Sequence, residues 1–379
     1  MKIRSLLTVV AALSLLLFGV GTAHAVFGVA DDVPARDVVI PVICGVDATN
    51  EINTNWAIAD VLGAGVVDLN GFVAHALAHL HNVSSKHVHD YSYDWTPNDV
   101  VVDNCKALTA ALSPAEKTDM TVTISGVDYY AGYVVVNQNN GPGPVFTTVL
   151  ERFTAWVYLV DALKGFASGF NGLSMEFGTN DAANGGLREA FSIGGVSQAI
   201  TAFTLYPRYF LNNDTALFPD TYNWWMVLLG RNQYNTLNVT STRFLEGFIC
   251  DEEENCQSTG IPIPVEFNVI DVGPILPGLP LHPAGFPKGG FALLNIVEHA
   301  NGIIVGAFTI HGTRNVSTSL PLALTDWYSV FGWSYERAQA TSVLASWDVI
   351  HPMFRTYCNV PNIPADPYIT GIPCVVSVP

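Results

Sequence analysis

The sequence predicts a mainly β fold, an antiparallel β-sandwich-like architecture in one or two lobes, with one C-terminal amphipathic helix. Hydrophobic residues make up 49% of the 379-residue chain and charged residues only 13%, as expected of a packed protein. Short segments rich in Val, Ile, Thr and aromatic residues recur along the chain, bounded by Gly, Pro, Asn or Asp, which is typical of strands joined by turns. A helical apolar pattern occurs near the C-terminus.

Residues 1–25 have the three parts of a secretory signal peptide. Lys2 and Arg4 precede an apolar run, and the small-residue sequence AHA ends at Ala25, where we expect cleavage. The alternative is an uncleaved membrane anchor, for which the run is short. No later segment has the roughly 18 to 20 consecutive apolar residues of a membrane span. We therefore expect an exported protein of the periplasm, cell surface or extracellular space.

The charge balance excludes one class of partner. The chain has 16 basic and 33 acidic residues, a formal net charge of −17. Such a surface repels phosphate backbones, so nucleic-acid binding is not expected. An acidic surface favours solubility and attracts cations without specifying which ones.

The six cysteines predict three disulfides, because an even number in an exported chain is most simply paired. Proximity in sequence favours two of the pairs, and elimination leaves the third. No CxxC spacing of a zinc ribbon or redox site is present, so we interpret the cysteines as structural. The predicted pairs are Cys250 with Cys256, Cys358 with Cys374, and Cys44 with Cys105.

In the first third of the chain, Val38–Val46 is an extended apolar segment, and Pro41 within it predicts an edge strand. A helix of one or two turns is expected from residue 105, ended by Pro114. Further strands are expected near residues 56–68, 71–82, 87–95, 120–127 and 129–137.

Residues 137–144, NQNNGPGP, form the sharpest break in composition. They predict a boundary between an N-terminal β lobe, residues 26–140, and a C-terminal β lobe, residues 141–379, although one continuous domain also fits. Phe153–Val160 is interpreted as a strand from its aromatic and β-branched residues. Residues 164–195, rich in glycine, are interpreted as a looped region.

Later in the chain, two apolar segments flank Asn301 and Gly302. Asn-Gly between strands is the strongest short signal of a β-hairpin. Residues 334–350 predict the C-terminal helix, because four apolar side chains share one helical face and Pro352 stops the pattern. These side chains are Val343, Leu344, Trp347 and Ile350.

Residues 72–91 contain five of the ten histidines. In a strand, His75, His79 and His81 lie on one face, and alanines and Leu80 lie on the other. His75 and His79 are then about 13 Å apart, too far to share an ion, whereas His79 and His81 are about 6.6 Å apart. We therefore leave His75 out of the candidate set.

His87 and His89 lie on one face of the expected partner strand, so the length of the connecting loop decides the geometry. With three or five loop residues, His81 faces His87 and His79 faces His89, and the four imidazoles form a candidate Zn or Cu site. With two or four loop residues, the two pairs lie on opposite faces. The alternative interpretation is a solvated strand face without metal.

No catalytic or cofactor-binding residue is predicted. The HExxH, GxSxG, P-loop and GxGxxG motifs are absent. A glycosidase needs two carboxylates that face each other, and nothing pairs any two of the candidates Glu176, Glu246, Glu266 and Glu298. Exposed tryptophans could stack on sugars or meet a protein partner, and core filling is the alternative. The tryptophans considered are Trp224, Trp225, Trp327, Trp333 and Trp347.

We therefore expect a secreted, non-catalytic structural or binding protein of the bacterial envelope or surface, with a protein or glycan as partner. One alternative is an extracytoplasmic Zn- or Cu-binding protein that uses His79, His81, His87 and His89. A second alternative is a carbohydrate-binding or carbohydrate-active protein.

Overall fold

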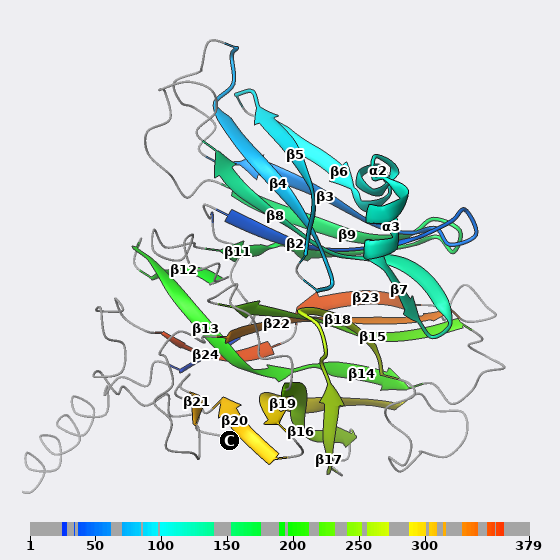
Figure 1. Cartoon of the computed structure of the whole chain (residues 1–379), viewed down its shortest axis with the longest axis vertical. Coiled ribbons are helices and arrows are strands. Elements are labelled where there is room, and N and C mark those ends of the chain that lie inside the picture. The colour runs from blue at the N-terminus through cyan, green and yellow to red at the C-terminus, as the bar shows by residue number, and fades with distance from the viewer. Residues whose placement is uncertain are drawn as a thin grey trace, which may run out of the picture.

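A computed structural model shows a mainly β protein built from antiparallel sheets (Figure 1). Strands make up 70% and helices 8% of the described residues, which confirms the predicted fold class. Residues 1–24 of the predicted signal peptide lie outside this part of the chain. The structure describes residues 25–28, 34, 37–61, 70–84, 86–97, 99–139, 153–175, 189–193, 196–211, 220–231, 241–251, 256–272, 288–300, 303–308, 314–315, 328–339, 347–352 and 354–359.

The N-terminal strands form two layers, whose strands pair in the orders β6–β3–β9–β10 and β5–β4–β8–β2–β11, with β7 also pairing with β8. The layers join where Cys44 of β2 lies opposite Asn53 of β3. Strands from both sides of residue 140 pair within one layer, since β9 lies beside β3. The bounds are β2 Asp37–Gly45, β3 Ile52–Asp60, β4 Ala74–Asn82, β5 His87–Trp95, β6 Val100–Asn104, β7 Thr121–Ile124, β8 Val127–Asn139, β9 Phe153–Asp161, β10 Phe166–Asn171 and β11 Leu173–Met175.

Aromatic side chains fill the space between the two layers. The Trp95 indole of β5 donates a hydrogen bond to the backbone carbonyl of Ile58 in β3 (3.0 Å). Its ring stacks on Phe153 of β9, with the centroids 4.8 Å apart. The Tyr93 hydroxyl donates to the Asp103 carboxylate of β6 (2.8 Å). Because strand side chains alternate between faces, burying these residues turns their neighbours outward.

Two short helices, α2 (Cys105–Ala110) and α3 (Pro114–Met120), follow β6. The predicted short helix from residue 105 is confirmed as α2, which ends before Pro114, whereas the second helix, α3, which begins at Pro114, was not predicted. Proline suits the first turn of a helix, where its missing N–H has no intrahelical partner. Ser113 and Glu116 also cap α3 reciprocally, each side chain accepting a hydrogen bond from the other's backbone N–H.

Two of the three predicted disulfides are confirmed. Cys44 and Cys105 link β2 to α2, and Cys250 and Cys256 link two adjacent strands. The predicted partner of Cys358, Cys374, lies outside the described residues.

β2 is an interior strand, so the edge position predicted from Pro41 is wrong. β2 pairs with β8 on one side, and on the other with β11 at Asp37–Val39 and with β3 at Cys44. On this second side the Ile43 N–H donates to the Thr54 hydroxyl (2.9 Å). N–H groups two residues apart point to the same side of a strand. The N–H that Pro41 lacks would therefore point to the side of β11 and β3. At Pro41 no described strand is paired with β2 on that side, so no hydrogen bond of the sheet is lost there.

A separate four-stranded sheet packs against the sandwich and lies below its strands in Figure 1. Its order is β18–β15–β22–β23. The Trp224 ring of β15 meets Tyr129 of β8 edge-on at 5.3 Å, and Trp333 of β22 lies 5.7 Å from Phe170 of β10. The bounds are β15 Asp220–Arg231, β18 Phe267–Asp271, β22 Tyr328–Gln339 and β23 Trp347–Pro352.

The predicted C-terminal helix is wrong, because its residues form strands wherever the structure describes them. β22 and β23 pair antiparallel, with Tyr335 opposite Ile350 and Ala338 opposite Trp347. Residues 340–346, with Val343 and Leu344, lie outside the described residues. The helical spacing of Trp347 and Ile350 is overridden because β22 also pairs with β15, so β23 extends an existing sheet.

The remaining strands continue the larger sheet; β12 and β13 lie at the left of Figure 1, and β14, β16, β17, β19, β20 and β21 lie toward its bottom. β19 and β20 pair antiparallel, which confirms the predicted hairpin strands, while Asn301 and Gly302 lie outside the described residues. The looped region predicted for residues 164–195 is wrong in part, because β10, β11 and β12 fall within it. The bounds are β1 Ala25–Gly28, β12 Glu189–Ile193, β13 Val196–Tyr206, β14 Arg208–Leu211, β16 Ser241–Asp251, β17 Cys256–Pro262, β19 Lys288–Ala300, β20 Ile303–Phe308, β21 Arg314–Asn315 and β24 Phe354–Asn359.

A buried ion pair connects the four-stranded sheet to the sandwich. The Arg337 guanidinium of β22 lies 2.5 Å from the Asp161 carboxylate of β9, and both side chains are buried. The same guanidinium lies over the Phe166 ring at 5.2 Å. Among the described residues, no helix is long and apolar enough to span a membrane.

We expect Asp161→Asn to lower the free energy of unfolding by about 3 to 5 kcal/mol, because it removes the negative charge that faces the buried Arg337 guanidinium. Asp119→Asn is a matched control, since Asp119 pairs with Lys86 at the surface, where such a pair contributes about 1 kcal/mol or less. Urea unfolding monitored by tryptophan fluorescence measures both. Equal losses in the two variants would contradict the prediction.

Candidate functional site

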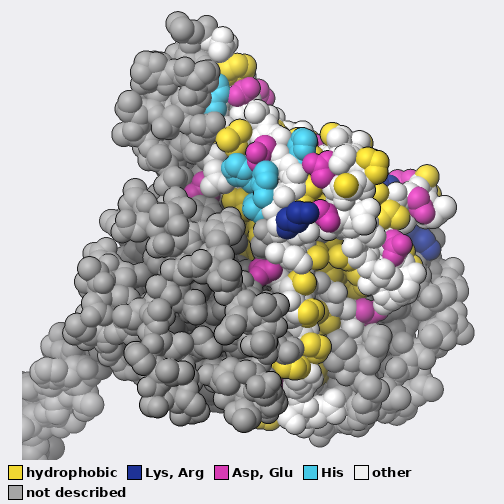
Figure 2. Space-filling view, viewed as in Figure 1, with side chains coloured by type: hydrophobic (Ala, Val, Ile, Leu, Met, Phe, Trp, Pro, Cys, Tyr) yellow, Lys and Arg dark blue, Asp and Glu magenta, His cyan; other side chains and the backbone are white. Residues whose placement is uncertain are grey.

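The histidine-rich stretch forms the hairpin of β4 and β5, as the strand interpretation predicted. The face of β4 that carries Ala74, Ala76, Ala78 and Leu80 is buried in the core. Because side chains alternate along a strand, the histidines of β4 lie on the opposite face. Figure 2 shows a group of histidines at the surface with acidic side chains beside it.

The turn of this hairpin is organised by Asn82. Its side-chain oxygen accepts hydrogen bonds from the N–H groups of Ser84 (3.0 Å) and Lys86 (2.9 Å), and its own N–H donates to the Lys86 carbonyl (3.0 Å). Four residues, 83–86, connect the strands. With an even number of loop residues, His89 lies opposite Leu80 and therefore on the core-facing side.

A β-bulge next to the turn separates the two histidines of β5. The register places His81 opposite His87 but Leu80 opposite His89, so Val88 is the extra residue. The bulge returns His87 to the face of His79 and His81. Beyond the bulge, Asp90 lies opposite His79. The predicted square of four imidazoles therefore does not form.

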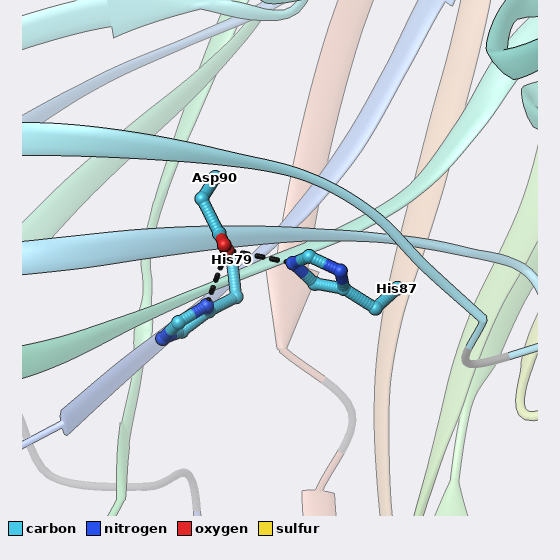
Figure 3. A group of neighbouring side chains, drawn as sticks. All are labelled: His79, His87 and Asp90. Carbon is cyan, nitrogen blue, oxygen red and sulfur yellow. Dashed lines mark hydrogen bonds and ion pairs between the residues drawn. The ribbon is translucent and has the colours of Figure 1, made fainter.

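The structure brings together His79, His87 and Asp90, as Figure 3 shows. Asp90 Oδ1 lies 2.6 Å from His79 Nδ1 and 2.6 Å from His87 Nε2. One ligand atom from each residue lies within 4.8 Å of the others. His79 is partly buried, and His87 and Asp90 are exposed, so a small ion can reach the group from solvent.

His81 supports this group from the side of β8. Its ring stacks on Tyr133, with centroids 5.0 Å apart and planes 8° apart, and lies 5.6 Å from the His87 ring. The His81 backbone lies so close to Gly132 that a Cβ there would be 2.1 Å from the His81 carbonyl oxygen. A glycine is thus required in β8 for β4 to lie where it does.

The other two histidines of the stretch have different partners. His89 Nδ1 lies 3.5 Å from the Glu116 carboxylate of α3, and its ring packs near Tyr91. His75 Nδ1 lies 2.6 Å from Asp94 Oδ1, one cross-strand pair further along the hairpin. Of the four predicted ligands, the structure thus brings only His79 and His87 into the group.

Sequence reasoning missed Asp90. The signal that could have found it is a symmetry of the hairpin: His79 with Asp90 and His75 with Asp94 are both directly opposed. An Asp opposite each of two histidines on one face indicates cross-strand His–carboxylate pairs. Three of the five tryptophans considered, Trp224, Trp225 and Trp333, are buried, as the core-filling alternative expected. Trp327 and the side chain of Trp347 lie outside the described part of the chain.

Two opposing effects act on the Asp90 carboxyl. Partial burial raises its pKa, but hydrogen bonds from His87 and His79 and the proximity of their rings outweigh this and hold the pKa below its usual value. Asp90 is therefore ionised at neutral pH. An ionised carboxylate between two imidazoles can accept hydrogen bonds from their N–H groups. Alternatively, the carboxylate and the two imidazoles can bind the same cation as ligands.

No known family matches the chain, and neither does any curated protein sequence. Function is therefore inferred from the residues of the chain itself. Two imidazole nitrogens and one carboxylate oxygen are donors that zinc and copper sites use.

On the core side of the hairpin, burial and the nearby carboxylates of Asp103 and Glu116 raise the pKa of Tyr91 to about 12. An unfolded tyrosine ionises near about pH 10. The contribution of the protonated Tyr91 hydroxyl to the free energy of unfolding is therefore complete below about pH 10. It is lost as the pH rises toward the higher pKa of the folded state. We expect Tyr91→Phe to make the free energy of unfolding decline less steeply over this alkaline range.

Urea unfolding at a series of alkaline pH values measures this slope. Tyr158→Phe serves as the control, because Tyr158 is an exposed tyrosine on β9. The same slope in wild type and in Tyr91→Phe would contradict the prediction.

Proposed function

We propose that this chain is an exported, non-catalytic binding protein whose β4–β5 hairpin binds one divalent transition-metal ion through His79, His87 and Asp90. The observation that carries the proposal is the convergence of three donor atoms within 4.8 Å on a pair of hydrogen-bonded strands. Around a tetrahedral zinc ion, ligand atoms lie roughly 3.3 Å apart. Small side-chain rotations would bring the three donors to that spacing.

The donor types favour a particular class of ion. Imidazole suits zinc, copper and nickel, whereas calcium and magnesium take oxygen ligands almost exclusively. Two nitrogens and one oxygen therefore favour Zn²⁺ or Cu²⁺. Three protein ligands leave coordination positions for water or for a group from a partner. The exposure of His87 and Asp90 keeps those positions accessible.

The surroundings of the group also suit a metal site. Ligands need a fixed orientation, and here it comes from the strand pairing, the bulge at Val88 and the stacked His81 and Tyr133 rings. The acidic chain attracts cations, with a formal net charge of −17. The two confirmed disulfides are consistent with export to an oxidising compartment.

A simpler arrangement has Asp90 bridging two protonated imidazoles without any metal. Both contacts are ion pairs if the histidines carry a charge. The two alternatives differ in what added Zn²⁺ does at neutral pH. A metal site binds Zn²⁺ and releases protons as it does so, whereas two imidazoles bridged only by Asp90 bind no Zn²⁺.

We expect the untagged protein to bind one Zn²⁺ per chain at neutral pH, as measured by isothermal titration calorimetry. His79→Ala, His87→Ala and Asp90→Asn should each weaken binding about tenfold or more, equivalent to about 1.4 kcal/mol. Each substitution removes one of the three converging donor atoms.

His75→Ala is the matched control, because His75 forms the same kind of cross-strand pair, with Asp94, on the same face. His89→Ala is a second control, from the opposite face. Both should bind Zn²⁺ within about twofold of wild type. The proposal fails if wild type takes up no Zn²⁺, or if His75→Ala loses as much affinity as His79→Ala.

A further inference from the structure

The outer face of the β6–β3–β9–β10 layer carries a continuous set of uncharged side chains. In one row Val102, Ala57, Trp156 and Asn171 lie side by side, and in the next Asn104, Asn55, Tyr158 and Gly169. We call this surface the neutral face. It consists of Val100, Val102 and Asn104 of β6, Asn53, Asn55, Ala57 and Ala59 of β3, Thr154, Trp156, Tyr158 and Val160 of β9, and Ala167, Gly169 and Asn171 of β10.

The absence of charge distinguishes this face within an acidic chain. The chain has 33 acidic residues, yet the neutral face as defined contains no Asp, Glu, Lys, Arg or His. The alternate side chains of the same strands face inward and form the sandwich core, so the residues of the neutral face point away from that core. An uncharged surface is complementary to an uncharged polar ligand, and it offers nothing to an ionic one.

Two exposed aromatic rings stand at the centre of the neutral face. Trp156 is 39% and Tyr158 is 47% exposed. As alternate residues of β9 they lie about 6.7 Å apart along the strand. Small residues flank both rings, Ala57 beside Trp156 and Gly169 beside Tyr158. The small neighbours leave the rings open to a flat ligand.

Amide groups border these rings. Asn53 Nδ2 donates to Asn55 Oδ1 (3.2 Å) and to Asn104 Oδ1 (3.3 Å), which holds the three amides in one array. Asn55 lies opposite Tyr158. An amide side chain offers two donor and two acceptor positions, more than the bonds of Asn55 and Asn104 use. The array can therefore bond to the hydroxyl groups of a ligand.

A buried hydroxyl lies in the neighbouring row. Thr154 is opposite Ala59 and two residues from Trp156. Its side chain is 6% exposed, and its hydroxyl oxygen has no hydrogen-bond partner among the described residues. Most buried polar atoms in folded proteins have a hydrogen-bond partner, so this one is an exception that needs an explanation. Thr154 is thus a second, independent polar feature on this face.

We propose that the neutral face binds a neutral polysaccharide, with pyranose rings stacked on Trp156 and Tyr158 and hydroxyl groups bonded to the asparagine amides. Aromatic rings present an apolar body for the C–H face of a sugar, and amides match its hydroxyls. The face has no carboxylate pair, which glycoside hydrolysis would need. The activity is therefore binding without cleavage, and it does not involve the hairpin of His79.

Affinity gel electrophoresis tests this directly. The probes are hydroxyethylcellulose, xylan and glucomannan, with polygalacturonate as the charged counterpart. We expect at least one neutral polymer to retard the wild-type protein, and polygalacturonate not to. Trp156→Ala and Tyr158→Ala should each weaken retardation about tenfold. Phe248→Ala is the matched control, because Phe248 is an exposed aromatic residue of β16, away from the neutral face.

Ala57→Arg provides a test that keeps both rings, since it places a long charged side chain beside Trp156. It should also abolish retardation, and far-ultraviolet circular dichroism shows whether each variant is folded. Adding a chelator should leave retardation unchanged, which separates this surface from the metal site. Retardation by none of the three neutral polymers, or equal retardation of Trp156→Ala and wild type, would overturn the proposal. The proposal would also be overturned if light scattering showed that the wild-type protein is a dimer and that Trp156→Ala is a monomer, because the neutral face would then be a contact between two copies of the chain.

Discussion

The apolar packing between the two sandwich layers is the constraint on which the other features of this protein depend. Trp95 joins the layers through its bond to the Ile58 carbonyl and its contact with Phe153. The four-stranded sheet adds Trp224 and Trp333 to the same core. Since every strand in these layers must turn one set of alternate side chains inward, the outward set is decided at the same time. Both surfaces to which we assign binding are outward sets.

On the hairpin, this constraint acts through two local devices. The even loop held by Asn82 turns His89 inward, toward Glu116 of α3. The bulge at Val88 keeps His87 outward, where it meets His79 and Asp90. A one-residue change in register reverses the face of every side chain that follows. The composition of the site thus depends on one extra residue in one strand.

The hairpin and the neutral face represent different chemistry on one scaffold. The hairpin gathers titratable groups whose mutual hydrogen bonds keep Asp90 ionised. The neutral face gathers aromatic rings and amides and excludes charge. They lie on different layers of the sandwich, the hairpin on the layer of β4 and the neutral face on the layer of β3.

Local sequence determined the strand content, the limits of β5, the alternation of β4 and the Cys250–Cys256 pair, because these follow from side-chain period and proximity along the chain. The Cys44–Cys105 pair was predicted by elimination. Tertiary structure decided the rest. Trp347 and Ile350 have helical spacing, yet they lie in a strand because β22 offers a partner. Pro41 is tolerated inside a sheet because its missing N–H would point to a place between β11 and β3 where no described strand is paired with β2. Asp90 replaces His89 in the candidate site because register is a property of two strands together, and neither strand's sequence specifies it alone.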